Sequence, residues 1–346
     1  MNQVKLALNI CTYKREQILR KNLDVLKESE FFNLSNSHFY NKLEIFVIDN
    51  ASELSLEGDS NLHLFHNPNT GGSGGFQRGI EEIRKHNDFT HVIFMDDDVS
   101  FEMSAFYILF DFLENENAEY LNRPIAGRML DKDNPNIQWT AAENWNSGEI
   151  QHVEFLRDIT DLTNPYIPGK AIYDADADYG GFWFCCYPFS FVKENDLIPF
   201  FLHCDDVEYG LRCGETPIII EGVHVWHETW EKKISPVIQY YDCRNSRFLN
   251  RMQGNYSNIC EELQEVKKEI HKAHMEGDVV REFILIKAFN DSFKSLEWLK
   301  RKENDGHHRK LIRMFRKRTG FEKMILLVVN KVFRQWVFYS LNSRIV

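Results

Sequence analysis

Three consecutive aspartates, Asp96, Asp97 and Asp98, directly follow the apolar run of residues 91–95. Two carboxylates at the end of a buried strand could share one divalent cation, and hard oxygen ligands suit Mg²⁺ or Mn²⁺. An ion held there could bridge the two phosphates of a bound diphosphate and neutralise the charge that builds on a leaving group. The alternative is an acidic turn or a helix N-cap whose charge lies in water. We favour the metal site because the triplet ends a strand.

A second acidic cluster, Asp205 and Asp206, precedes residues 207–213, which have helical spacing. One aspartate is expected to cap this helix, because a side-chain oxygen there accepts a backbone N–H bond. The other could face the cleft as the base that takes a proton from an acceptor hydroxyl. Capping alone is the alternative.

Histidine and tryptophan side chains follow later apolar runs. His227 could supply a third ligand to Mn²⁺, although a single histidine is more often a structural hydrogen-bond donor. Trp226 and Trp183 could stack on a sugar ring, or they could belong to the core.

Four glycines occupy five positions in residues 71–75, at the start of a predicted helix. Such a turn, Gly72 included, lets backbone N–H groups approach a phosphate or a sugar, aided by the helix N-terminus. The spacing matches neither the dinucleotide-binding GxGxxG motif nor a P-loop. The alternative is a flexible turn.

The elements that must position these residues are short apolar strands that alternate with helices. The strands are predicted at residues 5–11, 43–48, 62–66 and 91–95, with helices over 16–27 and from the glycine-rich turn to about residue 85. This order predicts an α/β fold, a mostly parallel sheet with helices on both faces. Ligands bind beyond the carboxyl ends of such strands, so Thr12, Asp49, Asn69 and the aspartate triplet should gather at one edge.

The second half of the chain is less regular. We predict a helix over 106–113, strands at 124–129, 182–186 and 217–220, and loops with irregular strands over 131–170. From about residue 236 the pattern becomes helical. We therefore predict two domains, residues 1–235 and 236–346.

The amino-acid composition limits the classes of protein to which the chain can belong. The 346 residues are 43% hydrophobic with a net charge of −11, which indicates a folded globular chain. Seven cysteines without a zinc-type pair favour a reducing compartment. Neither a signal peptide nor a spanning segment is evident, so we expect a cytoplasmic protein.

The charge is distributed unevenly along the chain. Residues 300–346 contain 13 Lys and Arg against 3 Asp and Glu, whereas residues 1–299 contain 28 against 49. An acidic body with a basic tail is not typical of a nucleic-acid binder. The segments 307–318 and 324–338 combine basic and apolar residues, which predicts an amphipathic helix on an anionic membrane surface. Docking on the acidic body or on another subunit is the alternative.

Taken in order, seven segments resemble one family. NICTYKR, VIDNAS, NPNTGGSGGFQRG, IFMDDDV, YGGFWFCC, CDDVEYGLR and VWHETW are similar to the family-2 glycosyltransferases with a GT-A fold, and most similar to their galactofuranosyltransferase branch. The resemblance covers roughly residues 4–250. It implies a Rossmann-like mixed sheet with flanking helices, to which the C-terminal helical segment is added.

The resemblance also implies roles for individual residues. Asp96, Asp98 and His227 would hold Mn²⁺ or Mg²⁺, Asp206 would be the catalytic base, and Asp205 would orient the acceptor. The acceptor would also meet Trp183 and Trp226. The nucleotide-sugar donor would meet Thr12, Arg15, Asp49, Asn69, Gly72, Arg78 and Asp97. The reaction would invert the anomeric centre in one displacement.

The implied donor is UDP-galactofuranose and the implied acceptor a lipid-linked or other glycan of a surface polysaccharide. The large galactan polymerases have an additional N-terminal β-rich domain, so we expect the addition of one or few sugars. UDP-galactose, UDP-glucose and dTDP-rhamnose remain alternative donors. A sugar- or nucleotide-binding protein without catalysis is the alternative from another class, and the oligomeric state, a homo-oligomer included, stays open.

Overall fold

The computed structural model describes residues 1–56, 58–229, 235–255 and 259–345, with side chains up to residue 339. The chain forms two compact units. Met1–Ile198 and Asp205–Lys232 form the first, here called the sheet unit, and Pro199–Cys204 and Lys233–Val346 form the second, called the helical unit. The predicted division at residue 235 adjoins residues 230–234, which lie outside the described residues, and it stays a prediction.

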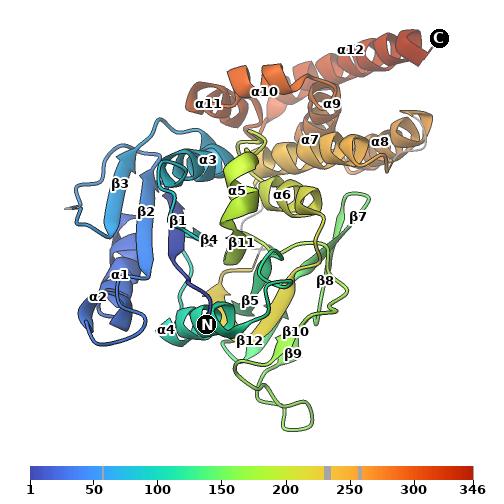
Figure 1. The fold of residues 1–346 in the computed structure, drawn as a ribbon. Coiled ribbons are helices and arrows are strands. Elements are labelled where there is room, and N and C mark those ends of the chain that lie inside the picture. Colours follow the sequence, from blue (N-terminus) through green and yellow to red (C-terminus); the bar gives the residue numbers. More distant parts are fainter. Residues whose placement is uncertain (57, 230–234, 256–258, 346) are drawn as a thin grey trace. The chain divides into compact units, whose positions relative to one another are not determined.

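The sheet unit is built on one mixed sheet, which has ten strands in the described part of the chain and the main order β10-β12-β5-β11-β4-β1-β2-β3. β6 and β9 extend it from β5, and β7 and β8 form a separate hairpin (Figure 1). The bounds are β1 (Leu6–Thr12), β2 (Leu43–Asp49), β3 (Leu62–His66), β4 (His91–Asp96), β5 (Ile125–Asp131), β6 (Ile137–Thr140), β7 (Glu143–Asn146), β8 (Glu149–His152), β9 (Arg157–Asp158), β10 (Ala171–Ile172), β11 (Cys185–Pro188) and β12 (Ile218–His227).

Alternating apolar residues along the strands serve two cores, one on each face of the sheet. On β1, Leu8 and Ile10 face the core that contains α1, α2 and α4, whereas Ala7 faces the core that contains α3, α5 and α6. These helices are α1 (Glu16–Lys27), α2 (Glu30–Asn33), α3 (Gly71–Ile83), α4 (Met103–Asn115), α5 (Phe189–Glu194) and α6 (Asp205–Cys213). Burial on both faces explains why the central strands are apolar runs.

The strand register brings the polar strand ends to one edge. β1, β2, β3 and β4 are parallel to one another, with Thr12 opposite Asp49, Asp49 opposite His66, and Cys11 opposite Asp96. The predicted convergence of strand ends is therefore confirmed for β1 to β4.

Two predicted strands differ from the structure. The strand expected at 182–186 begins only at Cys185, because Phe182 and Phe184 enter opposite cores from a turn. The strand expected at 217–220 continues to His227 as β12. Its register against β5 shifts between Ile219 and His224, where Gly222 has a φ of 95°. This irregularity masked the continuation in the sequence.

The helical unit contains the helices α7 (Pro236–Met252), α8 (Ile259–Met275), α9 (Val279–Asp291), α10 (Leu296–Lys302), α11 (Asp305–Met314) and α12 (Gly320–Ile345). α9 contacts α7, α8 and α12. A fully buried ion pair joins Arg244 of α7 to Glu303, with 2.6 Å from Nη1 to Oε1. No helix in the described part of the chain combines the length and apolar content needed to cross a membrane.

Candidate functional site

Asp96, Asp98 and His227 converge at the carboxyl edge of the sheet. His227 Nε2 lies 3.0 Å from Asp98 Oδ1 and 3.8 Å from Asp96 Oδ2, and one donor atom from each residue lies within 4.8 Å of the others. A divalent ion with ligands at about 2.1 Å holds its donor atoms roughly 3 to 4.2 Å apart. The spacing and the donor set, two carboxylates and an imidazole, therefore fit Mn²⁺ or Mg²⁺.

Backbone contacts hold the turn that carries these aspartates. Ser100 and Trp226 form an isolated antiparallel bridge, and each backbone N–H donates to the other carbonyl at 2.8 Å. The bridge places the residue before His227 beside the end of the aspartate turn. On the other side, Asn22 of α1 donates through Nδ2 to the carbonyls of Asp97 at 3.2 Å and Val99 at 3.0 Å.

Asp97 is the buried member of the triplet. It is 2% exposed, accepts a hydrogen bond from Thr12 Oγ1 at 2.5 Å, and pairs with Arg15 Nη1 at 2.7 Å. Burial raises the pKa of Asp97, and Arg15 and Thr12 oppose that rise. Arg15 Nη2 also lies 3.4 Å from Asp98 Oδ2, so one guanidinium contacts two carboxylates of the triplet.

The glycine-rich turn packs closely on the end of β1. α3 begins at Gly71, which has a φ of 73°, and a Cβ atom added to Gly75 would lie 2.1 Å from Cys11 Sγ. A Cβ added to Gly72 would meet only Asp205 Oδ2, at 4.0 Å. The glycine-rich turn is therefore next to Asp205, and part of its glycine content serves close helix packing.

The charges that surround Cys11 indicate that both acidic clusters lie at this edge of the sheet. Burial raises the pKa of its thiol, and the negative charges of Asp97, Asp96 and Asp205 raise it further. Asp205 is the first residue of α6, and Asp206 Oδ1 accepts the backbone N–H of Val207 at 2.8 Å. The helix thus begins two residues earlier than predicted, and both aspartates lie within its first turn. The bond from Asp206 to the next residue is not the predicted N-cap bond, in which the residue before the helix accepts from the second or third helical N–H.

Comparison with known proteins identifies the family. The sequence pattern described as Glycosyl transferase family 2 matches residues 8–180, half of the chain. The chain belongs to glycosyl transferase family 2. The matched range includes the glycine-rich turn and the aspartate triplet, and the α/β mixed sheet with flanking helices and a C-terminal helical segment confirms the predicted GT-A fold.

Two curated relatives of this family-2 chain are galactofuranosyltransferases GlfT2. The protein of Mycolicibacterium smegmatis is 32% identical over 206 residues, which cover 53% of this chain and 30% of the relative. That of Mycobacterium tuberculosis is 28% identical over 208 residues, 54% of this chain and 31% of the relative. The chain thus matches about a third of the length of these relatives.

Among solved structures, the mannosyltransferase PcManGT of Pyrobaculum calidifontis, in complex with GDP-Man and Mn²⁺, is similar at 11% sequence identity. The similarity covers 98% of this chain and 84% of that one, with a TM-score of 0.42.

Several residues predicted to meet the donor already have partners within this family-2 chain. Asp49 is fully buried and accepts backbone N–H bonds from Ala51, Glu53 and Leu54. Burial alone would raise the pKa of Asp49, but these hydrogen bonds lower it overall. The structure therefore gives the Asp49 carboxylate a role in holding the loop after β2, and donor contact stays a prediction.

Asn69 and Arg78 occupy the two ends of the glycine-rich segment. Asn69 Oδ1 accepts the backbone N–H of Gly71 at 3.1 Å, which shapes the entry to α3. Arg78 pairs with Glu82 and, at 3.7 Å, with Glu81 in its own helix. Donor contacts by both residues stay predictions.

The two candidate tryptophans are partly buried and anchored through their indole N–H groups. Trp183 Nε1 donates to the carbonyl of Gly127 at 2.7 Å, and Trp226 Nε1 donates to the carbonyl of Pro135 at 2.9 Å. Their indoles are thus fixed in orientation, and stacking on an acceptor sugar stays a prediction.

Asn22 and Ser100 support the site and were absent from the sequence prediction. Asn22 lies on the buried face of α1 with Leu19, Leu23 and Leu26. A polar side chain in an apolar stripe needs a buried partner, so this position carried a usable signal. Ser100 acts through its backbone, which left no signal in its side chain.

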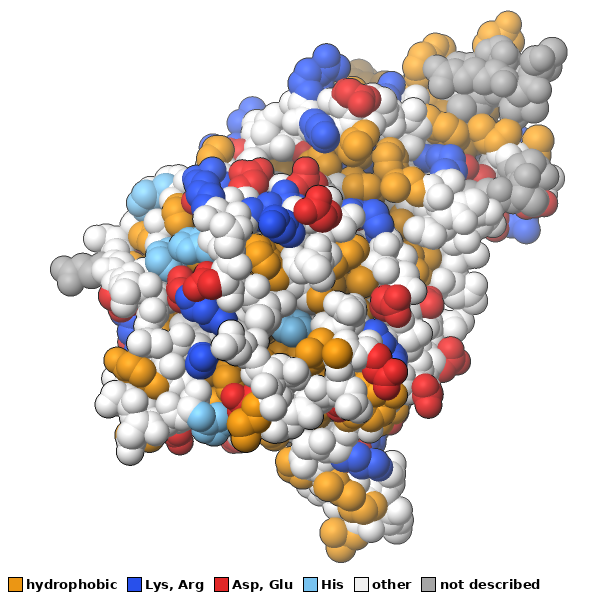
Figure 2. Space-filling model, viewed as in Figure 1, with side chains coloured by type: hydrophobic (Ala, Val, Ile, Leu, Met, Phe, Trp, Pro, Cys, Tyr) orange, Lys and Arg blue, Asp and Glu red, His pale blue; other side chains and the backbone are white. Residues whose placement is uncertain are grey.

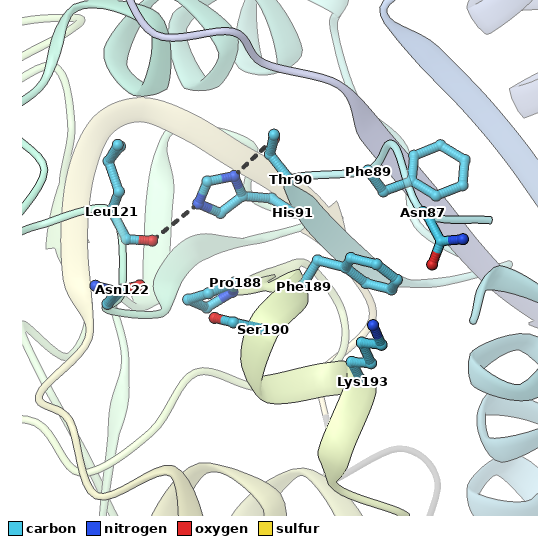
Figure 3. A pocket seen from close by; sticks show the side chains of 10 residues that line it. All are labelled: Asn87, Phe89, Thr90, His91, Leu121, Asn122, Pro188, Phe189, Ser190 and Lys193. Atoms are coloured by element: carbon cyan, nitrogen blue, oxygen red, sulfur yellow. Dashed lines mark hydrogen bonds between the residues drawn. The ribbon is translucent and has the colours of Figure 1, made fainter. Parts of the chain in front are cut away.

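A cavity of about 400 Å³ lies away from these residues (Figure 3). His91, the first residue of β4, lines it, whereas Asp96 is the last residue of that strand. The lining residues are Asn87, Phe89, Thr90, His91, Leu121, Asn122, Pro188, Phe189, Ser190 and Lys193. None of the predicted site residues is among them, so the cavity is separate from the candidate site.

Proposed function

We propose that this chain is an inverting, metal-dependent glycosyltransferase that takes a sugar from a nucleotide-diphosphate donor. The observation that carries the proposal is the cluster of Asp96, Asp98 and His227, with the glycine-rich turn and Asp205 at the same edge. A divalent ion bound by the cluster would neutralise the charge that develops on the departing diphosphate.

The residues of the chain supply binding and proton transfer. In this proposal Asp206 takes the proton of an acceptor hydroxyl as the oxygen attacks the anomeric carbon. The bond between that carbon and the diphosphate oxygen breaks, and its electron pair leaves with the nucleotide. Attack and departure occur on opposite faces, so the anomeric configuration inverts. Asp205 and Trp183 orient the acceptor.

Arg15 and the start of α3 supply the positive potential. Arg15 lies within reach of Asp97 and Asp98 and is about half exposed, so its guanidinium can also pair with a phosphate at this edge. The first backbone N–H groups of α3 lack partners within the helix and favour an anion there. Thr12, Asp49, Asn69, Gly72, Arg78 and Asp97 complete the proposed donor site.

The preferred donor is UDP-galactofuranose, and the support comes from the two relatives named galactofuranosyltransferases. UDP-galactose, UDP-glucose and dTDP-rhamnose are the competing donors. The proposed acceptor is a glycan or lipid-linked glycan of a surface polysaccharide, which places the enzyme in the cytoplasm at the inner face of the membrane.

A donor panel with Mn²⁺ present and then chelated tests the proposal, with release of UDP or dTDP as the readout. We expect turnover with UDP-galactofuranose and its loss on chelation. The result that overturns metal dependence is equal turnover in chelator, and preference for another donor overturns the sugar assignment.

Two substitutions test the residues. Asp206→Asn should lower turnover about 10²- to 10⁴-fold while donor binding is retained, because only the base is removed. Asp98→Asn should raise the Mn²⁺ concentration needed for half-maximal turnover. Glu102→Gln, an exposed carboxylate close to the triplet, is the matched control. Unchanged turnover in Asp206→Asn would show that Asp206 is not the base. Absence of turnover by the wild-type chain with every donor of the panel would assign the chain to the non-catalytic binding class instead.

A further inference from the structure

α12 packs on α9 through one stripe of its surface. Asn330 is fully buried and its Nδ2 donates to the carbonyl of Val279 at 2.9 Å, while Leu326 and Val337 on the same stripe are also buried. These positions recur at intervals of four and seven residues, so they lie on one side of the helix. The rest of α12 is left for other contacts.

A second stripe of α12 is apolar and exposed. Val328 is 65% exposed, Trp336 56% and Tyr339 77%. The stripe consists of Phe321, Met324, Ile325, Val328, Val329, Val332, Trp336 and Tyr339. Spacings of three and four residues place these side chains on one broad face. Figure 2 shows hydrophobic side chains exposed at the surface in the region of α12. Such a continuous exposed apolar stripe marks an interaction surface.

α11 lacks a comparable face. Leu311 is fully buried and Phe315, just beyond the helix, is 1% exposed, because both enter the core of the helical unit with Phe201. Ile312 is 48% exposed, so the membrane surface predicted for residues 307–318 keeps one exposed apolar residue and stays a prediction. Most of the exposed apolar surface described in the tail lies on α12.

The charge of the tail distinguishes between two possible partners of the stripe, a second copy of the chain and an anionic lipid surface. Residues 300–346 carry a large excess of basic residues, and Lys323, Lys331 and Arg334 lie on α12 itself. Glu322 is the acidic residue within Gly320–Ile345. Lys331 borders the stripe, whereas Lys323 and Arg334 lie toward the other side of the helix. Arg334 also pairs with Glu282 at 3.7 Å. A second copy packed through the same face would bring two basic tails together, which opposes association. An anionic lipid surface is attracted by the same residues.

We propose that α12 lies in the plane of an anionic membrane surface, with this exposed stripe buried at the headgroup boundary. Trp336 and Tyr339 suit that boundary, because their rings are apolar and carry a polar group. A peripheral helix of this kind needs no membrane-spanning segment. The proposal deepens the proposed function by naming the surface that would bring the enzyme to a lipid-linked acceptor.

Vesicle co-sedimentation of the full chain tests the inference. We expect binding to vesicles of phosphatidylcholine with phosphatidylglycerol, weaker binding in high salt, and little binding to phosphatidylcholine alone. The double variant Val328→Gln, Val332→Gln should bind at least about tenfold more weakly. The matched control is Ile150→Gln, Leu162→Gln, which changes two exposed apolar residues of the sheet unit.

Two outcomes would overturn the inference. One is vesicle binding by the double variant equal to that of the wild type while circular dichroism shows both folded. The other is a wild-type dimer in sedimentation velocity that the double variant converts to monomer, without vesicle binding by either, which would assign the stripe to a second copy. Turnover with a water-soluble acceptor should be unchanged in the double variant, so failure of the donor assay and failure of vesicle binding are separate results.

Discussion

Replacing Asn22 with leucine tests whether the aspartate turn is held ready for a metal ion. Asn22 is buried on α1, and its Nδ2 donates to the carbonyls of Asp97 and Val99, on either side of Asp98. Leucine has the same number of side-chain heavy atoms and the same branching as asparagine but donates no hydrogen bond. Asn22→Leu therefore removes both bonds without opening a large cavity. Both bonds go to the backbone of residues other than the three candidate ligands.

The two hydrogen bonds set the size of the effect. Each contributes a net of roughly 0.5–1.5 kcal/mol, so the free energy of unfolding should fall by about 1–3 kcal/mol. If these bonds hold the turn in its binding conformation, metal binding in the variant must restore that order itself. The loss in metal affinity is then bounded by the same energy, about 5- to 150-fold.

Mn²⁺-dependent turnover measures this loss. In Asn22→Leu the Mn²⁺ concentration for half-maximal turnover should rise by a factor within that range, and turnover at saturating Mn²⁺ should recover. Lys21→Leu, at the exposed neighbouring position of the same helix, should leave both quantities unchanged. A loss of stability in chemical denaturation with a Mn²⁺ requirement at its wild-type value would show that the two bonds serve the fold alone.

Three further predictions follow from local geometry. Gly75→Ala should destabilise the chain by about 1–3 kcal/mol in chemical denaturation, since its Cβ would lie 2.1 Å from Cys11 Sγ, whereas Gly72→Ala should not. Burial lowers the pKa of His91 to about 4. Between pH 6.5 and 4 the His91 imidazole is therefore protonated in the unfolded chain but neutral in the folded chain. Stability is therefore lost as pH falls through that window, by up to about 1.4 kcal/mol per pH unit for His91, and His91→Gln should show a shallower loss. Glu303→Gln should cost about 3–5 kcal/mol by leaving Arg244 buried without its charge partner, and Glu265→Gln, at an exposed position, should be neutral.

The sequence predicted which residues lie at the edge of the site better than it predicted the hydrogen bonds that hold those residues in place. Apolar runs followed by polar residues were enough to place Thr12, Asp49 and Asp96 together, because parallel strands end on the same side. The partners of Asp49, by contrast, are backbone groups of a loop, and no side-chain pattern encodes them. The full length of β12 was also hidden, because Glu221 and Gly222 interrupt its apolar pattern at the irregular register.

The candidate metal cluster of Asp96, Asp98 and His227 depends on the turn that follows β4. β4 and β12 are separated by β11 and β5, so their ends should lie about 14 Å apart at roughly 4.8 Å per strand. Yet Asp98 contacts His227 at 3.0 Å. β11 begins at Cys185, opposite Phe94 and Ala126, and therefore stops short of Asp96 at the end of β4. Residues 97–100 follow β4 beyond this point, and Ser100 pairs with Trp226. The cluster thus requires a short β11 as well as three ligands, which explains why ligand type alone could not place it.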